Sequence, residues 1–179
     1  MKTENMALYI LRLAVTLLLI TGITAAALAG VNAITKDKIA AIEAQKTLDA
    51  IAVVLPGVDG VKEQKLSGDP GIVQAVYASG DSYAIKVAPG GFNGTITMMV
   101  GISEGKVTGI SIIGHTETPS LGAVAAEDTA KGEAFRSQFV DGEGFTVGEN
   151  VDAMSGATIT SKAVTAGVNA ALEYFESLG

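Results

Sequence analysis

Residues 96–113, ITMMVGISEGKVTGISII, form two apolar runs on either side of a short polar turn at 103–106. In the first run every second residue from Ile96 to Ile102 is apolar. This alternation is typical of a β-strand with one buried face, and a glycine-containing turn between two such runs is typical of a hairpin. The stretch therefore predicts an antiparallel hairpin with one apolar face. Its two methionines are interpreted as core side chains.

A second hairpin is expected just before the first. Residues 73–78 and 83–87 are mostly apolar and flank Ser-Gly-Asp-Ser at 79–82, which is a turn signal. A glycine-rich turn at 89–94 connects the two hairpins. Residues 57–71 are polar and contain several glycines, so we expect a loop there.

Helical patterns follow the hairpins. Within residues 121–140, Phe135 and Phe139 have the i, i+4 spacing of one helix face, with Gly132 as a candidate interruption. Apolar residues at near-helical spacing predict a last helix over residues 161–178. The order of elements predicts an α+β domain with a mostly antiparallel sheet and flanking helices.

The N-terminal part contains a long segment without charge, residues 13–35. As a helix it would be roughly 35 Å long, enough to cross the apolar core of a bilayer. A cleaved signal peptide is the alternative, because Ala27-Leu28-Ala29 has the small-x-small pattern of a cleavage site. We favour a retained transmembrane helix, because the apolar segment exceeds the length of a signal-peptide core and continues past Ala29. Both alternatives export the remaining residues.

The sequence suggests three parts. Residues 1–35 are the N-terminal tail and transmembrane helix, residues 36–56 an amphipathic linker helix, and residues 57–179 the globular domain. Pro56 and Gly57 end the linker helix. Its imperfect apolar face consists of Ile39, Ile42, Leu48, Ile51 and Leu55. Basic residues lie on both sides of the apolar segment, so their distribution does not decide its orientation.

Composition excludes several functions. The chain of 179 residues has no cysteine, which excludes disulfides, cysteine-ligated zinc and thiolate-bound iron–sulfur clusters within it. Its single histidine argues against a conventional metal site, so no metal is expected. The net charge of −7 provides no electrostatic support for binding nucleic acid.

The stretch 152–158, DAMSGAT, lies just before the last predicted helix, whose start we expect close to Thr160 or Ser161. A helix start has unpaired N–H groups and a positive dipole end, which suit a phosphate. The small Gly156 and Ala157 would let a phosphate ester approach the backbone. Capping of the helix by serine and threonine side chains is the alternative, and it is the more common use of such a cluster.

The same stretch resembles the D-x-x-S/T-G-A-T motif of FMN-binding domains in the G subunit of Rnf complexes and in the C subunit of the sodium-pumping quinone reductase. The resemblance implies that a flavin transferase attaches FMN covalently to Thr158 as a phosphate ester. Ser155, Gly156, Ala157 and Thr160 would surround the phosphate. Ala153 replaces the usual glycine. Asp152 would either cap the turn or hold magnesium for the transferase.

Two further stretches extend the resemblance. Gly91-Phe92-Asn93-Gly94 resembles the first signature of the family, and residues 115–122, HTETPSLG, resemble its H-x-E-T-P-G-L-G stretch. Ser120 replaces a glycine, which would cost stability if this position needs a positive φ.

The resemblance implies that the stretch 115–122 contacts the isoalloxazine ring through His115, Glu117, Thr118, Leu121 and Gly122. The carboxylate of Glu117 would then lower the flavin potential. From the residues alone, the favoured interpretation of His115 is a hydrogen-bonded histidine at the end of a strand.

The resemblance implies a single-pass protein of the cell membrane with an extracytoplasmic FMN-binding domain. Such a chain relays electrons in a complex that couples electron transfer between ferredoxin and NAD to Na⁺ or H⁺ transport. Expected partners are the FMN-bearing D subunit, the iron–sulfur A/E pair, the peripheral B and C subunits, the flavin transferase and the membrane. No catalytic residue is expected, since the chain alone turns over no substrate. The alternatives are a flavinylated domain of another extracytoplasmic reductase and a non-redox anchored binding module.

Overall fold

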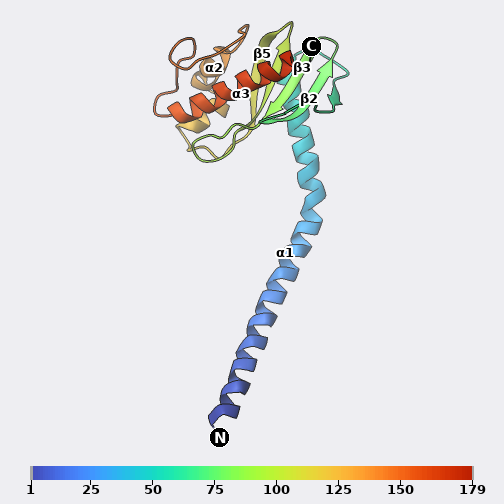
Figure 1. Cartoon of the computed structure of the whole chain (residues 1–179), viewed down its shortest axis with the longest axis vertical. Coiled ribbons are helices and arrows are strands. Elements are labelled where there is room, and N and C mark those ends of the chain that lie inside the picture. Colours follow the sequence, from blue (N-terminus) through green and yellow to red (C-terminus); the bar gives the residue numbers. More distant parts are fainter. Residues whose placement is uncertain (1, 179) are drawn as a thin grey trace. The chain divides into compact units, whose positions relative to one another are not determined.

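The computed structural model describes residues 2–178, with side chains from residue 6 onward. The chain divides into two compact units, Met1–Gln45 and Lys46–Gly179, which are described separately. The long helix α1, Lys2–Val54, provides the first unit and the beginning of the second (Figure 1).

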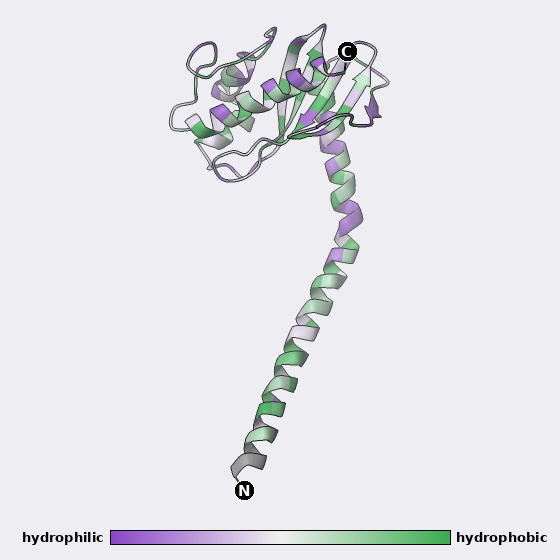
Figure 2. Ribbon diagram, viewed as in Figure 1, coloured by the Kyte–Doolittle hydropathy of each residue, from purple (hydrophilic) through white to green (hydrophobic). Residues whose placement is uncertain are grey.

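In the first unit the apolar side chains of α1 are exposed. Along the helix the apolar segment is followed by a polar one before the second unit begins (Figure 2). Within the described chain, Met6–Val54 is the one helix long and apolar enough to cross a membrane. The predicted apolar segment is therefore confirmed as a candidate membrane span.

The second unit is built on a five-stranded antiparallel sheet in which strand order follows the sequence (Figure 1). The strands are β1 (Lys62–Gln64), β2 (Val73–Ser79), β3 (Ser82–Val87), β4 (Thr97–Ser103) and β5 (Lys106–Gly114). Both predicted hairpins are confirmed, β2 with β3 and β4 with β5. The short strand β1 lies in a segment that we expected to be a loop. Its three residues are exposed and pair with the edge of β2 through the backbone, so they show no apolar alternation.

Both faces of the sheet are covered, which corrects the prediction of one apolar face for the hairpin at residues 96–113. On one face α3 (Thr158–Glu176) contributes Val164 and Val168 to the main core with Met98. On the other face Val54 and neighbouring residues at the end of α1 pack against Met99. Both methionines are fully buried, as predicted.

The last turn of α1 lies close to the sheet backbone. Thr108 on β5 donates a hydrogen bond of 2.5 Å to the carbonyl of Val54. A side chain at Gly101 on β4 would collide with the same carbonyl. Of the predicted apolar face of the linker helix, Ile51 and Leu55 are buried, whereas its other three members, Ile39, Ile42 and Leu48, are exposed. Only the end of that face therefore has a packing partner.

The segment between the sheet and α3 contains a short 3-10 helix, η1 (Gly122–Ala126), and α2 (Ala130–Ser137). Gly132 does not interrupt the helix, contrary to expectation. It lies buried in the first turn of α2 and donates its N–H to the side chain of Thr129 at 3.2 Å. A side chain there would collide with the carbonyls of Val124 and Glu127, so glycine is needed for close packing.

Candidate functional site

A cleft of about 350 Å³ opens at the N-terminus of α3. It brings together two stretches that the sequence analysis singled out separately, 115–122 and 152–158. Its walls are formed by Phe92, Glu117, Thr118, Leu121, Gly122, Gly156, Ala157, Thr158, Ile159 and Thr160. The fold thus brings three separate segments, at Phe92, 117–122 and 156–160, to one cavity.

Glu117 connects these three segments. Its side chain is buried, with 6% of the residue exposed. One carboxylate oxygen accepts the backbone N–H of Asn93 at 3.1 Å, and the other accepts the hydroxyl of Thr160 at 2.6 Å. No lysine or arginine among residues 6–178 forms an ion pair with this carboxylate. Glu117 is therefore satisfied by neutral donors and lines the cleft.

Two glycines make room for the carboxylate. A side chain at Gly91 would collide with one oxygen of Glu117, and a side chain at Gly122 would collide with the other and with the hydroxyl of Thr160. In the same turn, the side-chain amide of Asn93 donates a hydrogen bond to the carbonyl of Thr116 at 2.7 Å. This bond connects the turn to the loop 115–122. Close approach of the three segments depends on these small residues.

Ser120 adopts a positive φ of 61°. Glycine, which the resemblance led us to expect here, enters such a conformation without a steric penalty, whereas serine has a Cβ that disfavours it. The loop keeps the conformation, because the N–H groups of Leu121 and Ala123 both bond to the carbonyl of Thr118 at 3.2 Å. The replacement therefore leaves strain at the edge of the cleft.

His115 is exposed and does not belong to the cleft lining. Its Nδ1 accepts the backbone N–H of Glu117 at 3.2 Å, directly after the end of β5 at Gly114. The structure therefore places it as the hydrogen-bonded histidine at a strand end. It supports the loop backbone that presents Glu117.

The helix α3 begins at Thr158, two residues before the earlier of the two starts expected from the sequence. Its N-cap is Ala157, and no side chain caps it. This contradicts the alternative in which the serine and threonine cluster serves as a cap. The N–H groups of Thr158, Ile159 and Thr160 lie in the first turn, where a helix provides no backbone acceptors. The side chain of Thr158 is exposed at this end.

The comparisons with known proteins agree with this arrangement. Residues 91–173 match the FMN-binding domain family, and residues 1–54 match the RnfG N-terminal region. The chain is 33% identical over 192 residues to the G subunit of the Na⁺-translocating ferredoxin:NAD⁺ oxidoreductase complex of Acetobacterium woodii, an alignment that covers 94% of this chain and 93% of that protein.

Two further relatives have similar names. The G subunit of the proton-translocating ferredoxin:NAD⁺ oxidoreductase complex of Clostridium ljungdahlii is 43% identical over 101 residues, which cover 51% of this chain and 52% of that protein. The G subunit of the ion-translocating oxidoreductase complex of Methanosarcina acetivorans is 29% identical over 176 residues, covering 92% and 94%.

The chain belongs to the family of Rnf complex G subunits.

The cleft of this family member contains groups that could hold FMN. An exposed hydroxyl and uncapped N–H groups at the start of α3 suit a phosphate ester. The exposed apolar side chains of Phe92, Leu121 and Ile159 suit an aromatic ring system. Gly156, with a φ of 74°, brings the backbone of the motif into the cleft lining.

Two of the residues predicted to surround the phosphate differ in position: Thr160 is part of the cleft wall, whereas Ser155 is not. The hydroxyl of Thr160 is 2.6 Å from Glu117 and is buried. Ser155 lines a second cleft of about 540 Å³ on the other side of Leu121. Asp152 lines this second cleft as well, together with Lys131 on α2. The first half of the motif therefore faces a different cavity from the second half.

Sequence reasoning did not include Phe92 and Ile159 among the site residues, although both line the cleft. Phe92 is 65% exposed, whereas Phe135, Phe139 and Phe145 are buried. Its place in a glycine-rich turn between two strands was the available signal, because an aromatic residue there has no strand neighbours to pack against. Ile159 follows the motif directly and had no comparable signal.

Proposed function

We propose that this chain carries FMN as a phosphate ester of Thr158 and relays electrons in a membrane-bound ferredoxin:NAD⁺ oxidoreductase complex. The observation that carries the proposal is the position of the Thr158 hydroxyl, exposed at the uncapped start of α3 and beside a cleft with apolar walls. Bound FMN supplies reversible electron transfer at its ring. A covalent link would prevent its loss outside the cytoplasm, where no pool of FMN refills the site.

Different groups of the protein would hold the phosphate and the ring of the cofactor. The first-turn N–H groups of α3 and the positive end of the helix dipole stabilise the phosphate. The hydroxyl of Thr160 already has Glu117 as its acceptor, so the backbone N–H groups are the principal donors in this proposal. Phe92, Leu121 and Ile159 would enclose the ring, and Thr118 would provide a polar contact at its edge.

Glu117 would set the redox state that the site favours. A carboxylate close to the ring disfavours an anionic reduced flavin and so lowers its potential. Both of its oxygens are hydrogen-bonded, and no cation pairs with it among residues 6–178. Its charge would therefore lie in the wall of the cleft without a cation from the described residues beside it.

The helix α1 would anchor the chain as a single membrane span, with the FMN-binding domain outside the cytoplasm. The names of the relatives support assembly with other subunits of an ion-translocating complex. We propose the D subunit with its FMN and the iron–sulfur A/E pair as redox neighbours, with the peripheral B and C subunits in the same complex. A flavin transferase would load the cofactor.

Mass spectrometry tests the attachment. The full chain, co-expressed with a flavin transferase, should gain the mass of FMN less one water, and the modified peptide should contain Thr158. Thr158→Ala should abolish the covalent flavin completely, because the hydroxyl is the group that forms the ester. Thr160→Ala is the matched control and should retain it, since this hydroxyl bonds to Glu117. Retention in Thr158→Ala together with loss in Thr160→Ala would show that the acceptor has been assigned to the wrong threonine.

A further inference from the structure

The stretch 152–157, which we call the attachment loop, is bound by a residue outside the motif. Gln138 follows the last turn of α2, and its side chain pairs with both backbone groups of Asp152. Its Oε1 accepts the N–H of Asp152 at 2.7 Å, and its Nε2 donates to the carbonyl at 3.3 Å. The amide thus bonds to Asp152 much as a neighbouring strand would.

The other end of the attachment loop is bound by Ser161 on α3. The hydroxyl of Ser161, fully buried, accepts the N–H of Met154 at 3.0 Å and donates to the carbonyl of Ala157 at 3.0 Å. Within the loop, the N–H of Ala157 bonds to the carbonyl of Met154 at 3.0 Å. The loop is therefore connected to α3 at its end and to α2 at its beginning.

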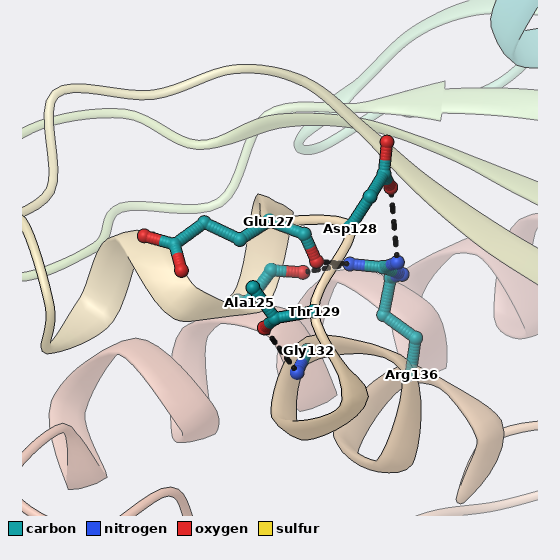
Figure 3. Close-up of polar contacts among 6 residues, drawn as sticks. All are labelled: Ala125, Glu127, Asp128, Thr129, Gly132 and Arg136. Atoms are coloured by element: carbon teal, nitrogen blue, oxygen red, sulfur yellow. Dashed lines mark hydrogen bonds and ion pairs between the residues drawn. The ribbon is translucent and has the colours of Figure 1, made fainter.

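The support for Gln138 is itself rigidly attached. Arg136, in the last turn of α2, donates to the carbonyl of Ala125 in η1 at 2.8 Å and to that of Glu127, just after η1, at 2.9 Å (Figure 3). At the start of α2 the hydroxyl of Thr129 caps the helix by accepting the N–H of Gly132. On the opposite side Phe135 and Phe139 form an edge-to-face pair with centroids 5.5 Å apart in the core. Gln138 lies between these anchors and the attachment loop.

We propose that Gln138 is a positioning residue for flavin attachment: it orders the attachment loop so that Thr158 is presented in one conformation. The proposal rests on the proposed ester at Thr158. When FAD is the donor, the bond from Thr158 Oγ to the FMN phosphorus forms as the pyrophosphate bond breaks, the hydroxyl proton is lost, and AMP leaves. Gln138 contacts none of these atoms. It acts only on the conformation of the loop that enters the transferase.

The expected kinetic effect follows from this role. If only a fraction of the protein has the ordered loop, the apparent affinity of the transferase falls by that fraction, whereas the rate at saturation stays the same. Gln138→Leu keeps the approximate size of the side chain and removes both hydrogen bonds to Asp152. We expect it to raise the half-saturating concentration of the apo-protein about tenfold, which corresponds to about 1.4 kcal/mol. This is within the range for the loss of two hydrogen bonds.

The test uses the full chain in detergent with purified flavin transferase and FAD, and it follows covalent flavin fluorescence at increasing chain concentration. Gln138→Glu retains an acceptor for the N–H of Asp152 but places a carboxylate oxygen against the carbonyls of Asp152 and Phe135, which accept from Nε2 in the wild type, so it should lose affinity as well. Ser137→Ala is the matched control, because this hydroxyl bonds only within α2, to the carbonyl of Ala134. Amide hydrogen exchange at Asp152 should be faster in Gln138→Leu and unchanged in Ser137→Ala.

The outcomes separate the two proposals. If the wild-type chain acquires no flavin at Thr158, the proposed function is wrong. If the wild type is loaded and Gln138→Leu has the same half-saturating concentration, Gln138 is not a positioning residue. A lower rate at saturation with an unchanged half-saturating concentration would also contradict the inference. If Gln138→Leu folds poorly, Gln138→Glu takes its place. It should raise the half-saturating concentration and leave the rate at saturation unchanged.

Discussion

The hydroxyl of Thr160 donates a hydrogen bond of 2.6 Å to the carboxylate of Glu117, which lies 43 residues earlier in the chain. The bond is buried and connects the first turn of α3 to the loop after β5. Because the other oxygen of the carboxylate accepts the N–H of Asn93, a single side chain joins the three segments that line the cleft. Structure and proposed redox tuning therefore depend on the same residue.

Replacing Glu117 by glutamine should raise the flavin potential. The substitution removes a negative charge and keeps an oxygen that can accept the N–H of Asn93, while its NH2 can donate to the hydroxyl of Thr160. One charge at about 4 Å contributes about 1–4 kcal/mol, or about 20–90 mV for a two-electron couple. Redox titration of the loaded protein measures the shift. Glu149→Gln makes the same charge change at an exposed residue outside the cleft lining and should leave the potential unchanged. An equal potential in wild type and Glu117→Gln would remove Glu117 from the ring environment.

Replacing Ser120 by glycine should stabilise the domain. The φ of 61° disfavours a residue with a Cβ, and glycine relieves this cost, partly offset by its greater freedom in the unfolded chain. We expect a gain of about 0.5–1 kcal/mol in the free energy of unfolding, measured by denaturant titration. Ser120→Ala is the control, since it keeps the Cβ and should give no comparable gain. A loss of stability in Ser120→Gly would mean that the serine hydroxyl makes a compensating contact.

Replacing Phe92 by alanine should alter the bound flavin while leaving the fold intact. Phe92 is 65% exposed, so its removal should change the free energy of unfolding by less than about 0.5 kcal/mol. The absorption and fluorescence spectra of the flavin should shift, because one aromatic wall of the cleft is lost. Phe139→Ala provides the contrast, since Phe139 is fully buried and its truncation should cost about 3–5 kcal/mol. An unchanged flavin spectrum in Phe92→Ala would place the ring away from this wall.

Protease accessibility tests the topology. The apolar segment of α1 is proposed as a retained membrane span with the second unit outside the cytoplasm. Protease added to intact, wall-stripped cells should digest that unit, and the N-terminal residues should remain with the membrane. A mature chain that begins at Gly30 would indicate a cleaved signal peptide. Protection of the second unit until the cells are lysed would reverse the orientation.

Much of the local structure could be predicted from residue patterns. The alternation of apolar residues and the turn signals located both hairpins, because pleat and turn geometry depend on neighbouring residues. The absence of charge from residues 13–35 located the candidate membrane span, because the hydropathy of a segment depends only on its own residues. The small residues of the motif indicated a helix start, but the capping alternative was wrong because Ala157 occupies the N-cap.

Contacts between distant segments depend on how separately formed elements pack. The position of Gln138 against Asp152, the pairing of β1 and the burial of the last turn of α1 on the second face of the sheet have no periodic signal. A hydrogen bond between side chains far apart in sequence leaves no trace in the local pattern. Local patterns were enough to locate the candidate membrane span, the hairpins and the motif that contains Thr158. Whether these parts enclose one cleft depended instead on the packing of α3 beside the loop 115–122, because the cleft is lined by residues of both, joined by the hydrogen bond between Thr160 and Glu117.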